Sequence, residues 1–135
     1  PFCSSPLHSQ QNIRFLFYTP TDTKIHLKKN DTSVVIQKDQ FLIPGDSTQK
    51  MEKQWVKNLS VGSQTHQIKI LILGHHGSKT STSSALLNKL PHLKMAIASS
   101  RFKKYGHPHK DVLNRLQSRK LNVIRTEDWG NLYFH

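Results

Sequence analysis

The chain has a single cysteine, Cys3, which excludes an internal disulfide framework and a cluster of thiolate metal ligands. No apolar run approaches the ~18 residues of a membrane-spanning helix, and the N-terminal residues lack the pattern of a signal peptide. Hydrophobic residues make up 35% of the 135 residues, below the ~45% of a typical globular domain. This shortfall indicates a fragment, or a surface that further chain normally covers.

Acidic residues are also scarce. Eight Asp and Glu stand against twenty Lys and Arg, which gives a net charge of +12 and a pI near 10.1. Such a field attracts polyanions, so nucleic acid or an anionic membrane surface is the expected partner, with general solubility as the alternative. The basic residues are dispersed except for a concentration in one stretch, formed by Arg101, Lys103, Lys104 and Lys110. Because this stretch also carries histidines, attraction of a substrate is the favoured interpretation.

Hydrophobic periodicity predicts strands that alternate with helices. Strands are expected at 13–18, 33–37, 41–43, 68–73, 94–98, 121–125 and 132–134, with the second and third forming a hairpin. Helices are expected at 48–59, from Ser83 or Ser84 to Leu90, and at 111–120, with a turn at 128–131. Residues 1–12 are interpreted as a linker or tail, and 13–135 as one α/β layered domain with a mixed sheet.

The most informative motif is Gly-His-His-Gly-Ser at 74–78, which directly follows an apolar strand. Packing alone seldom requires two histidines between glycines, and imidazole is the commonest protein ligand for transition metals. In extended chain the rings of His75 and His76 would point to opposite sides. One can then ligate a metal while the other holds a neighbouring group or a substrate oxygen.

Two further loops carry residues of the same chemistry. Asp46 ends the apolar strand before it and can ligate one cation or bridge two, although a turn aspartate that bonds its own backbone is the alternative. His107 and His109 flank Pro108 in a stiff loop, and their rings can ligate metal, or grip a phosphodiester and protonate its leaving oxygen. An exposed turn with incidental histidines is the alternative there. In α/β folds the loops after the strands build the site, where all these residues fall.

The remaining histidines show no such context and are interpreted as surface residues: His8, His26, His66, His92 and His135. A hydrolytic metal lowers the pKa of its bound water to about 7, but one aspartate and one or two histidines do not complete a zinc or two-metal site. No His-x-His-x-Asp-His or His-x-Asp-x-Asp-His run occurs in the chain. At least two ligands are therefore expected to be missing from it.

Taken in order, the segments 30–35, 42–46, 72–78 and 105–109 resemble the second half of a metallo-β-lactamase-fold domain. More narrowly, residues 13–135 resemble the C-terminal domain of ComEC-type DNA-internalisation competence proteins. The resemblance implies a C-terminal half of an αββα sandwich, whose first histidine-rich motif precedes residue 1. It also implies that Asp46 is the bridging acid and that His76, or less readily His75, is the late metal-binding histidine. Asn30 and Ser33 stand where many such proteins have a further histidine, so that ligand is absent.

The leading hypothesis is part of a metal-dependent phosphodiesterase that cleaves DNA during uptake. Asp46 and His76 would hold Zn or Mn, and His75, His107 and His109 would support the substrate or proton transfer. Arg101, Lys103, Lys104 and Lys110 would track the nucleic-acid backbone. The chain alone is expected to bind metal poorly and to be inactive.

The alternatives are a non-catalytic, basic DNA-binding module on a degenerate hydrolase scaffold and, ranked last, a small-molecule phosphoesterase. Expected partners are DNA, the rest of the polypeptide with its membrane channel domain, and a second copy of the fragment. The resemblance places the domain on the outer face of the cytoplasmic membrane.

Overall fold

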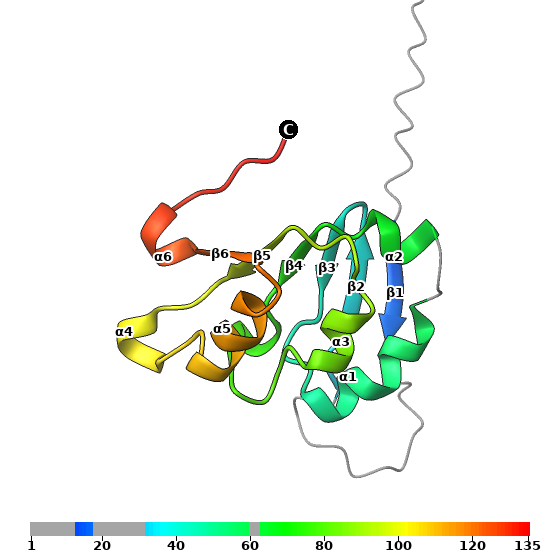
Figure 1. Cartoon of the computed structure of the whole chain (residues 1–135), viewed down its shortest axis with the longest axis horizontal. Helices are drawn as coiled ribbons and strands as arrows, with labels where there is room; N and C mark the ends of the chain where they lie inside the picture. The colour runs from blue at the N-terminus through cyan, green and yellow to red at the C-terminus, as the bar shows by residue number, and fades with distance from the viewer. Residues whose placement is uncertain (1–12, 18–31, 60–62) are drawn as a thin grey trace, which may run out of the picture.

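The computed structural model describes residues 13–17, 32–59 and 63–135, in which six strands form one mixed sheet (Figure 1). The order in the sheet follows the sequence: β1 (Ile13–Phe17), β2 (Val35–Lys38), β3 (Phe41–Ile43), β4 (Ile70–Ile72), β5 (Met95–Ala98) and β6 (Asn122–Arg125). β1, β2 and β3 pair antiparallel, and β3 to β6 pair parallel. The predicted α/β fold with a mixed sheet and flanking helices is confirmed, as is the hairpin of β2 and β3.

Parallel neighbours require crossover connections, and each connection here carries helices. Between β3 and β4 lie α1 (Gln49–Trp55), the 3₁₀ turn η2 (Val56–Asn58) and α2 (Ser63–Gln67). Between β4 and β5 lie the 3₁₀ segment η3 (Gly74–Gly77) and α3 (Ser84–Asn88). Between β5 and β6 lie α4 (Phe102–Tyr105) and α5 (Lys110–Gln117), and α6 (Thr126–Trp129) follows β6. The segments that leave β3, β4, β5 and β6 consequently start from the same edge of the sheet.

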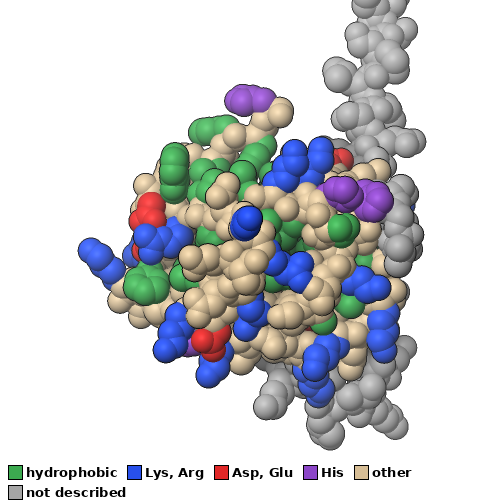
Figure 2. Space-filling model, in the orientation of Figure 1, with side chains coloured by type: hydrophobic (Ala, Val, Ile, Leu, Met, Phe, Trp, Pro, Cys, Tyr) green, Lys and Arg blue, Asp and Glu red, His purple; other side chains and the backbone are tan. Residues whose placement is uncertain are grey.

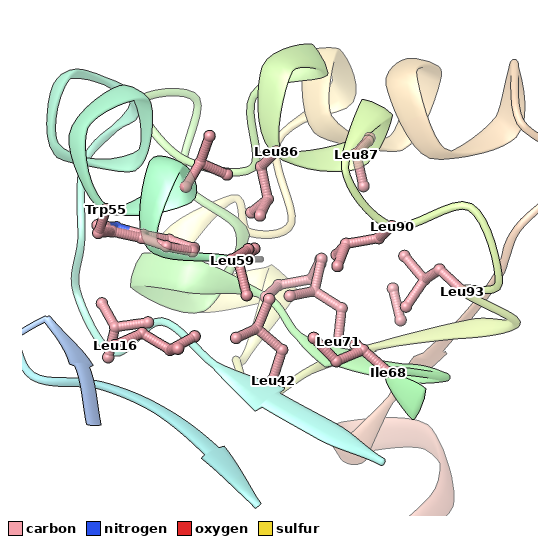
Figure 3. Close-up of a cluster of buried hydrophobic side chains, with 14 of the residues drawn as sticks. Leu16, Leu42, Trp55, Leu59, Ile68, Leu71, Leu86, Leu87, Leu90 and Leu93 are labelled. Atoms are coloured by element: carbon pink, nitrogen blue, oxygen red, sulfur yellow. The ribbon is translucent and has the colours of Figure 1, made fainter. Parts of the chain in front are cut away.

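The main core lies on one face of the sheet (Figure 3). Leu42, Leu71 and Ala96 are in register on neighbouring strands and are fully buried. Trp55 of α1 packs in the same cluster, and its indole N–H donates to Ser47 Oγ at 2.9 Å. Burial of each large apolar side chain contributes about 1.5–3 kcal/mol, so this cluster anchors the helices from which the edge loops depart.

The opposite face of the sheet is also apolar. Ile36 pairs with Ile43, and Ile72, Ile97 and Ile124 are in register across β4, β5 and β6. Ile97 is buried but lies outside the main core cluster, whereas the other four are half-buried. The sheet therefore presents a second apolar surface opposite the main core.

Several predicted boundaries need correction. The predicted helix at 48–59 is α1 followed by η2. No helix is predicted from the sequence at 63–67 or at 102–105, where the structure has α2 and α4. The predicted turn at 128–131 overlaps the end of α6. The predicted strand at 132–134 is wrong, because Phe134 instead packs edge-on against the Phe41 ring, with 5.1 Å between centroids.

Some predictions fall on residues that the structure does not describe. The linker at 1–12, Asn30, His8 and His26 lie outside the described residues. His66, His92 and His135 are exposed, as predicted. Among the described helices, none combines the length and apolarity needed to cross a bilayer.

Candidate functional site

The Gly-His-His-Gly turn brings two edge loops together. The amide of His75, just after β4, donates to the carbonyl oxygen of Gly45, just after β3, at 2.8 Å. Asp46 follows Gly45, and its own amide donates to Ser33 Oγ at 2.7 Å. The predicted proximity of the Asp46 loop and the histidine pair is therefore present in the backbone, and Ser33 supports the turn that carries Asp46.

The histidine pair is not in extended chain, which corrects the prediction. His75 has φ 47° and ψ 43°, and His76 has φ 57° and ψ 23°, so both lie in the left-handed region. Non-glycine residues rarely adopt this conformation, which costs about 1–2 kcal/mol for each residue. Strained backbone of this kind clusters at functional sites, where the surrounding structure holds it in place.

The turn interlocks with the second histidine loop. Gly77 has φ +81°, and a Cβ added there would lie 2.7 Å from Cβ of the buried Pro108. The carbonyl oxygen of Gly77 accepts a hydrogen bond from the amide of His109 at 2.8 Å. The two motifs that stood out in the sequence therefore contact each other directly.

His76 is oriented by the strand beside it. Its Nδ1 lies 2.6 Å from the carbonyl oxygen of Ser99, which follows β5. A carbonyl oxygen only accepts, so Nδ1 carries the proton and Nε2 is left as the basic nitrogen. Metal-ligating histidines commonly donate their second N–H to a backbone carbonyl in this way.

A cleft of about 1250 Å³ opens at this edge of the sheet. Three imidazoles and three cationic side chains line it: His75, His76, His107, Arg101, Lys103 and Lys104. The acidic side chain at its wall, Glu127, accepts a hydrogen bond from the Phe102 amide at 3.0 Å and lies 3.8 Å from Arg125. With that carboxylate engaged, the cleft is positively charged overall. Lys and Arg also dominate the charged side chains of the face seen in Figure 2.

His107 faces the histidine pair. Its ring centroid lies 6.4 Å from that of His75, and its backbone carbonyl accepts from Ser100 Oγ at 2.9 Å. Its Nδ1 is buried and has no hydrogen-bond partner among the described residues. The position of His107 is therefore fixed by the hydrogen bond to its backbone carbonyl and not by a hydrogen bond to Nδ1.

Three predicted site residues lie outside the lining of the cleft: Asp46, His109 and Lys110. Asp46 is exposed beside the histidine turn. The His109 ring caps α5, where Nδ1 accepts a hydrogen bond from the Asp111 amide at 3.2 Å. The His107 side chain therefore lines the cleft, whereas the His109 side chain is hydrogen-bonded to the first turn of α5. Catalytic roles for these residues stay predictions.

The described residues supply few candidate metal ligands. No group of three or more His, Cys, Asp or Glu side chains within 13–17, 32–59 and 63–135 is arranged to hold a metal ion. Catalytic zinc sites use about three protein ligands, so Asp46 and His76 on their own fall short of one.

A buried carboxylate that the sequence analysis missed supports the histidine turn from behind. Glu52 of α1 is fully buried and accepts from the amides of Thr82 and Ser83, at 2.6 and 2.7 Å. Burial raises the pKa of Glu52 above its ordinary value. The hydrogen bonds from the Ser83 side chain and from the Ser83 and Thr82 amides, together with the Arg115 charge, lower it by less than burial raises it. The burial of Glu52 could have been predicted from its position three residues before Trp55, which places it near the apolar face of the predicted helix.

The loop that Glu52 holds is tied in turn to the histidine motif. Ser81 Oγ donates to the carbonyl oxygen of Gly74 at 2.6 Å and also contacts the carbonyl oxygen of Ser78 at 2.9 Å. The Arg115 side chain donates to the carbonyl oxygens of Ser81 and Thr82, at 3.0 and 2.9 Å. Residues of α1, α5 and the 78–83 loop therefore form one polar support for the turn, which is buried at Glu52, Ser81 and Thr82.

The sequence of the chain is similar to segments of three known proteins. The chain is 31% identical to competence protein ComA of Neisseria gonorrhoeae, over 98% of this chain. It is 30% identical to ComE operon protein 3 of Bacillus subtilis over 78% of the chain, and 30% identical to recombination protein 2 of Haemophilus influenzae over 90%. The chain is a homologue of one segment of these proteins. No family model matches it, and no solved structure matches it.

The shared segment is a small part of each relative. The chain spans 19% of the length of ComA, 14% of ComE operon protein 3 and 15% of recombination protein 2. The matches to ComA and recombination protein 2 span the positions of both histidine motifs, because they cover 98% and 90% of the chain. The ComEC-type resemblance is therefore supported at the level of homology, while the metallo-β-lactamase fold stays a proposal.

Proposed function

We propose that this chain supplies the DNA-binding cleft and part of the metal site of a phosphodiesterase that acts on DNA during uptake. The observation that carries the proposal is the convergence of three imidazoles and three cationic side chains on one cleft at the sheet edge. Cationic side chains bind phosphates by displacing counterions, and imidazoles donate to phosphate oxygens or move protons near neutral pH. The similarity to a competence protein and a recombination protein supports DNA as the polyanion.

The side chains divide into roles by their positions. Arg101, Lys103 and Lys104 contact successive phosphates. His75 and His107, with 6.4 Å between ring centroids, hydrogen-bond to the oxygens of a phosphodiester group between them. His109 acts indirectly, because it caps α5 and joins the His107 loop to the Gly77 carbonyl.

Asp46 and His76 are the proposed metal ligands. The Nδ1–H of His76 donates to Ser99, which leaves Nε2 for a cation, and the Asp46 loop is hydrogen-bonded to the histidine turn. A bound Zn or Mn would lower the pKa of a coordinated water to about 7 and neutralise charge on the phosphoryl oxygens. Two ligands do not make such a site, so the proposal requires further ligands from chain outside the described residues.

The fold proposed for the complete domain is a metallo-β-lactamase-like αββα sandwich. The row of isoleucines opposite the main core supports it, because a second sheet packed there would cover a surface that is now half-buried. The proposed source of that sheet is another part of the same polypeptide, and a second copy of this chain is the alternative. In the whole protein, a membrane channel domain would hold this one at the outer face of the cytoplasmic membrane.

A second candidate function is DNA binding without catalysis. It is favoured by the lack of three suitably placed metal donors among the described residues. In this case the cleft would bind DNA with an affinity that falls steeply with salt and does not respond to chelators.

The test uses the full polypeptide that contains this chain and measures Mn- or Zn-dependent hydrolysis of DNA. Asp46→Ala and His76→Ala should each abolish most of the activity while DNA binding by the cleft persists. His92→Ala is the matched control, because His92 is exposed and lies outside the cleft. Unchanged hydrolysis in both site variants would rule out the metal assignment. Chelator-insensitive binding with no hydrolysis would establish the second candidate.

A further inference from the structure

Large aromatic side chains are exposed at the end of the molecule that carries α4 and α6. Tyr105 of α4 is 58% exposed and Trp129 of α6 is 69% exposed, whereas Trp55 is fully buried in the core. Figure 1 shows α4 and α6 at the same end, beyond β5 and β6. Core packing therefore does not account for the positions of these two aromatic side chains.

Tyr105 combines this exposure with a position among cationic groups. It lines the same cleft as Lys103 and Lys104, and Lys104 Nζ lies 5.1 Å from the centre of its ring. Trp129 does not itself line the cleft, but it is the last residue of α6, and the first two residues of that helix, Thr126 and Glu127, do. A strand whose phosphates contact the lysines would therefore pass close to an aromatic face.

The nucleic-acid chemistry that fits this pairing is that of unpaired bases. In a duplex the faces of the bases are stacked on each other, so only phosphates, sugars and groove edges are offered to a flat aromatic side chain. In a single strand or a frayed end each base has a free π-face, and aromatic rings beside a basic groove are the usual partners for it.

We propose that Tyr105 forms a base-stacking subsite at the rim of the cleft, with Trp129 as a second platform, and that the cleft thereby prefers unpaired nucleic acid over duplex. This inference rests on the proposed DNA-binding function of the same cleft and specifies its substrate class. The lysines bind the backbone of any nucleic acid, and the aromatic rings distinguish the unpaired form.

The experiment compares three labelled probes by fluorescence anisotropy with the 135-residue chain: an oligothymidylate, its duplex with oligoadenylate, and an abasic strand of equal length. Stacking contributes roughly 5- to 150-fold in affinity for each base. Tyr105→Ala should weaken binding of the oligothymidylate by about tenfold and leave the other two probes unchanged. Tyr105→Phe, which keeps the ring, should bind as the wild type does. Tyr133→Ala is the matched control, because Tyr133 is 78% exposed and lies outside the cleft.

Trp129 provides a direct spectroscopic readout. Its indole fluorescence should be quenched by the oligothymidylate but not by the abasic strand, and Trp129→Phe should remove that quenching while the buried Trp55 signal remains. Equal affinities for all three probes, or equal effects of Tyr105→Ala and Tyr133→Ala, would overturn the stacking subsite while leaving DNA binding intact. Failure of every probe to bind would instead overturn the proposed function. Anionic phosphatidylglycerol vesicles serve as the competing partner, and a loss confined to vesicle binding in Tyr105→Ala would also overturn the subsite.

Discussion

Replacing Gly77 by alanine should be among the most damaging small changes in this chain. The backbone there has φ +81°, which costs an alanine about 1–2 kcal/mol. The new Cβ would also lie 2.7 Å from Cβ and 2.9 Å from Cα of Pro108, and relief of such overpacking costs about 1–3 kcal/mol. Together the free energy of unfolding should fall by about 2–5 kcal/mol, a large share of the ~5–15 kcal/mol of an ordinary domain.

The matched control is Gly106→Ala. Gly106 has φ +65°, but a Cβ added there meets no atom within 4 Å. This variant should therefore lose only the backbone contribution of about 1–2 kcal/mol. Urea denaturation of both variants, followed by circular dichroism, separates the cost of the conformation from the cost of the contact with Pro108.

The contact also joins the two histidine loops, so Gly77→Ala should weaken binding of DNA under conditions where the variant is still folded. Gly106→Ala lies outside that contact and should bind nearly as the wild type does. Equal losses of stability in the two variants would refute the close approach of Gly77 to Pro108.

The other predictions concern the supports of the site. Burial raises the pKa of Glu52 in the folded state above its value in the unfolded state. The stabilisation that protonated Glu52 gives to the folded state is therefore fully present below the unfolded pKa, and it is lost as pH rises through the folded pKa. Wild type should therefore lose stability relative to Glu52→Gln over that pH window, and urea midpoints that move the opposite way would contradict the assignment. His109→Ala should cost about 1 kcal/mol through loss of the α5 cap, whereas His109→Asn should largely restore stability. If His109→Asn restores folding but abolishes hydrolysis in the full polypeptide, His109 has a chemical role beyond capping.

The strands and the loops that carry the candidate site could be predicted well from the sequence, because apolar runs and their periodicity depend only on residues that are close together in the chain. The apolar run before Gly74 contains β4, and the stretch at 111–120 contains most of α5. Since parallel strands end at one edge, placing Asp46, His75 and His76 in loops after strands was enough to predict that they lie near one another.

What the sequence did not predict depends on contacts between distant residues. The conformation of His76 is set with Ser99 and the Pro108 loop, which lie more than 20 residues away in sequence. The engagement of His109 by the α5 amide depends on where that helix begins. Residues 132–134 have the composition of a strand, but Phe134 packs against the ring of Phe41 and the segment does not pair with a strand of the sheet.

The central claim is that the cleft at the sheet edge binds the DNA backbone through Arg101, Lys103 and Lys104. The most direct test is the salt dependence of DNA affinity in a variant in which these three residues are replaced by alanine. The control variant replaces three exposed lysines outside the cleft by alanine: Lys53, Lys57 and Lys89. Each lost phosphate contact removes about 0.9 from the slope of log affinity against log salt, so the cleft variant should lose roughly 2–3 in slope. The control variant should keep nearly the wild-type slope. Equal slopes for the two variants would contradict the account.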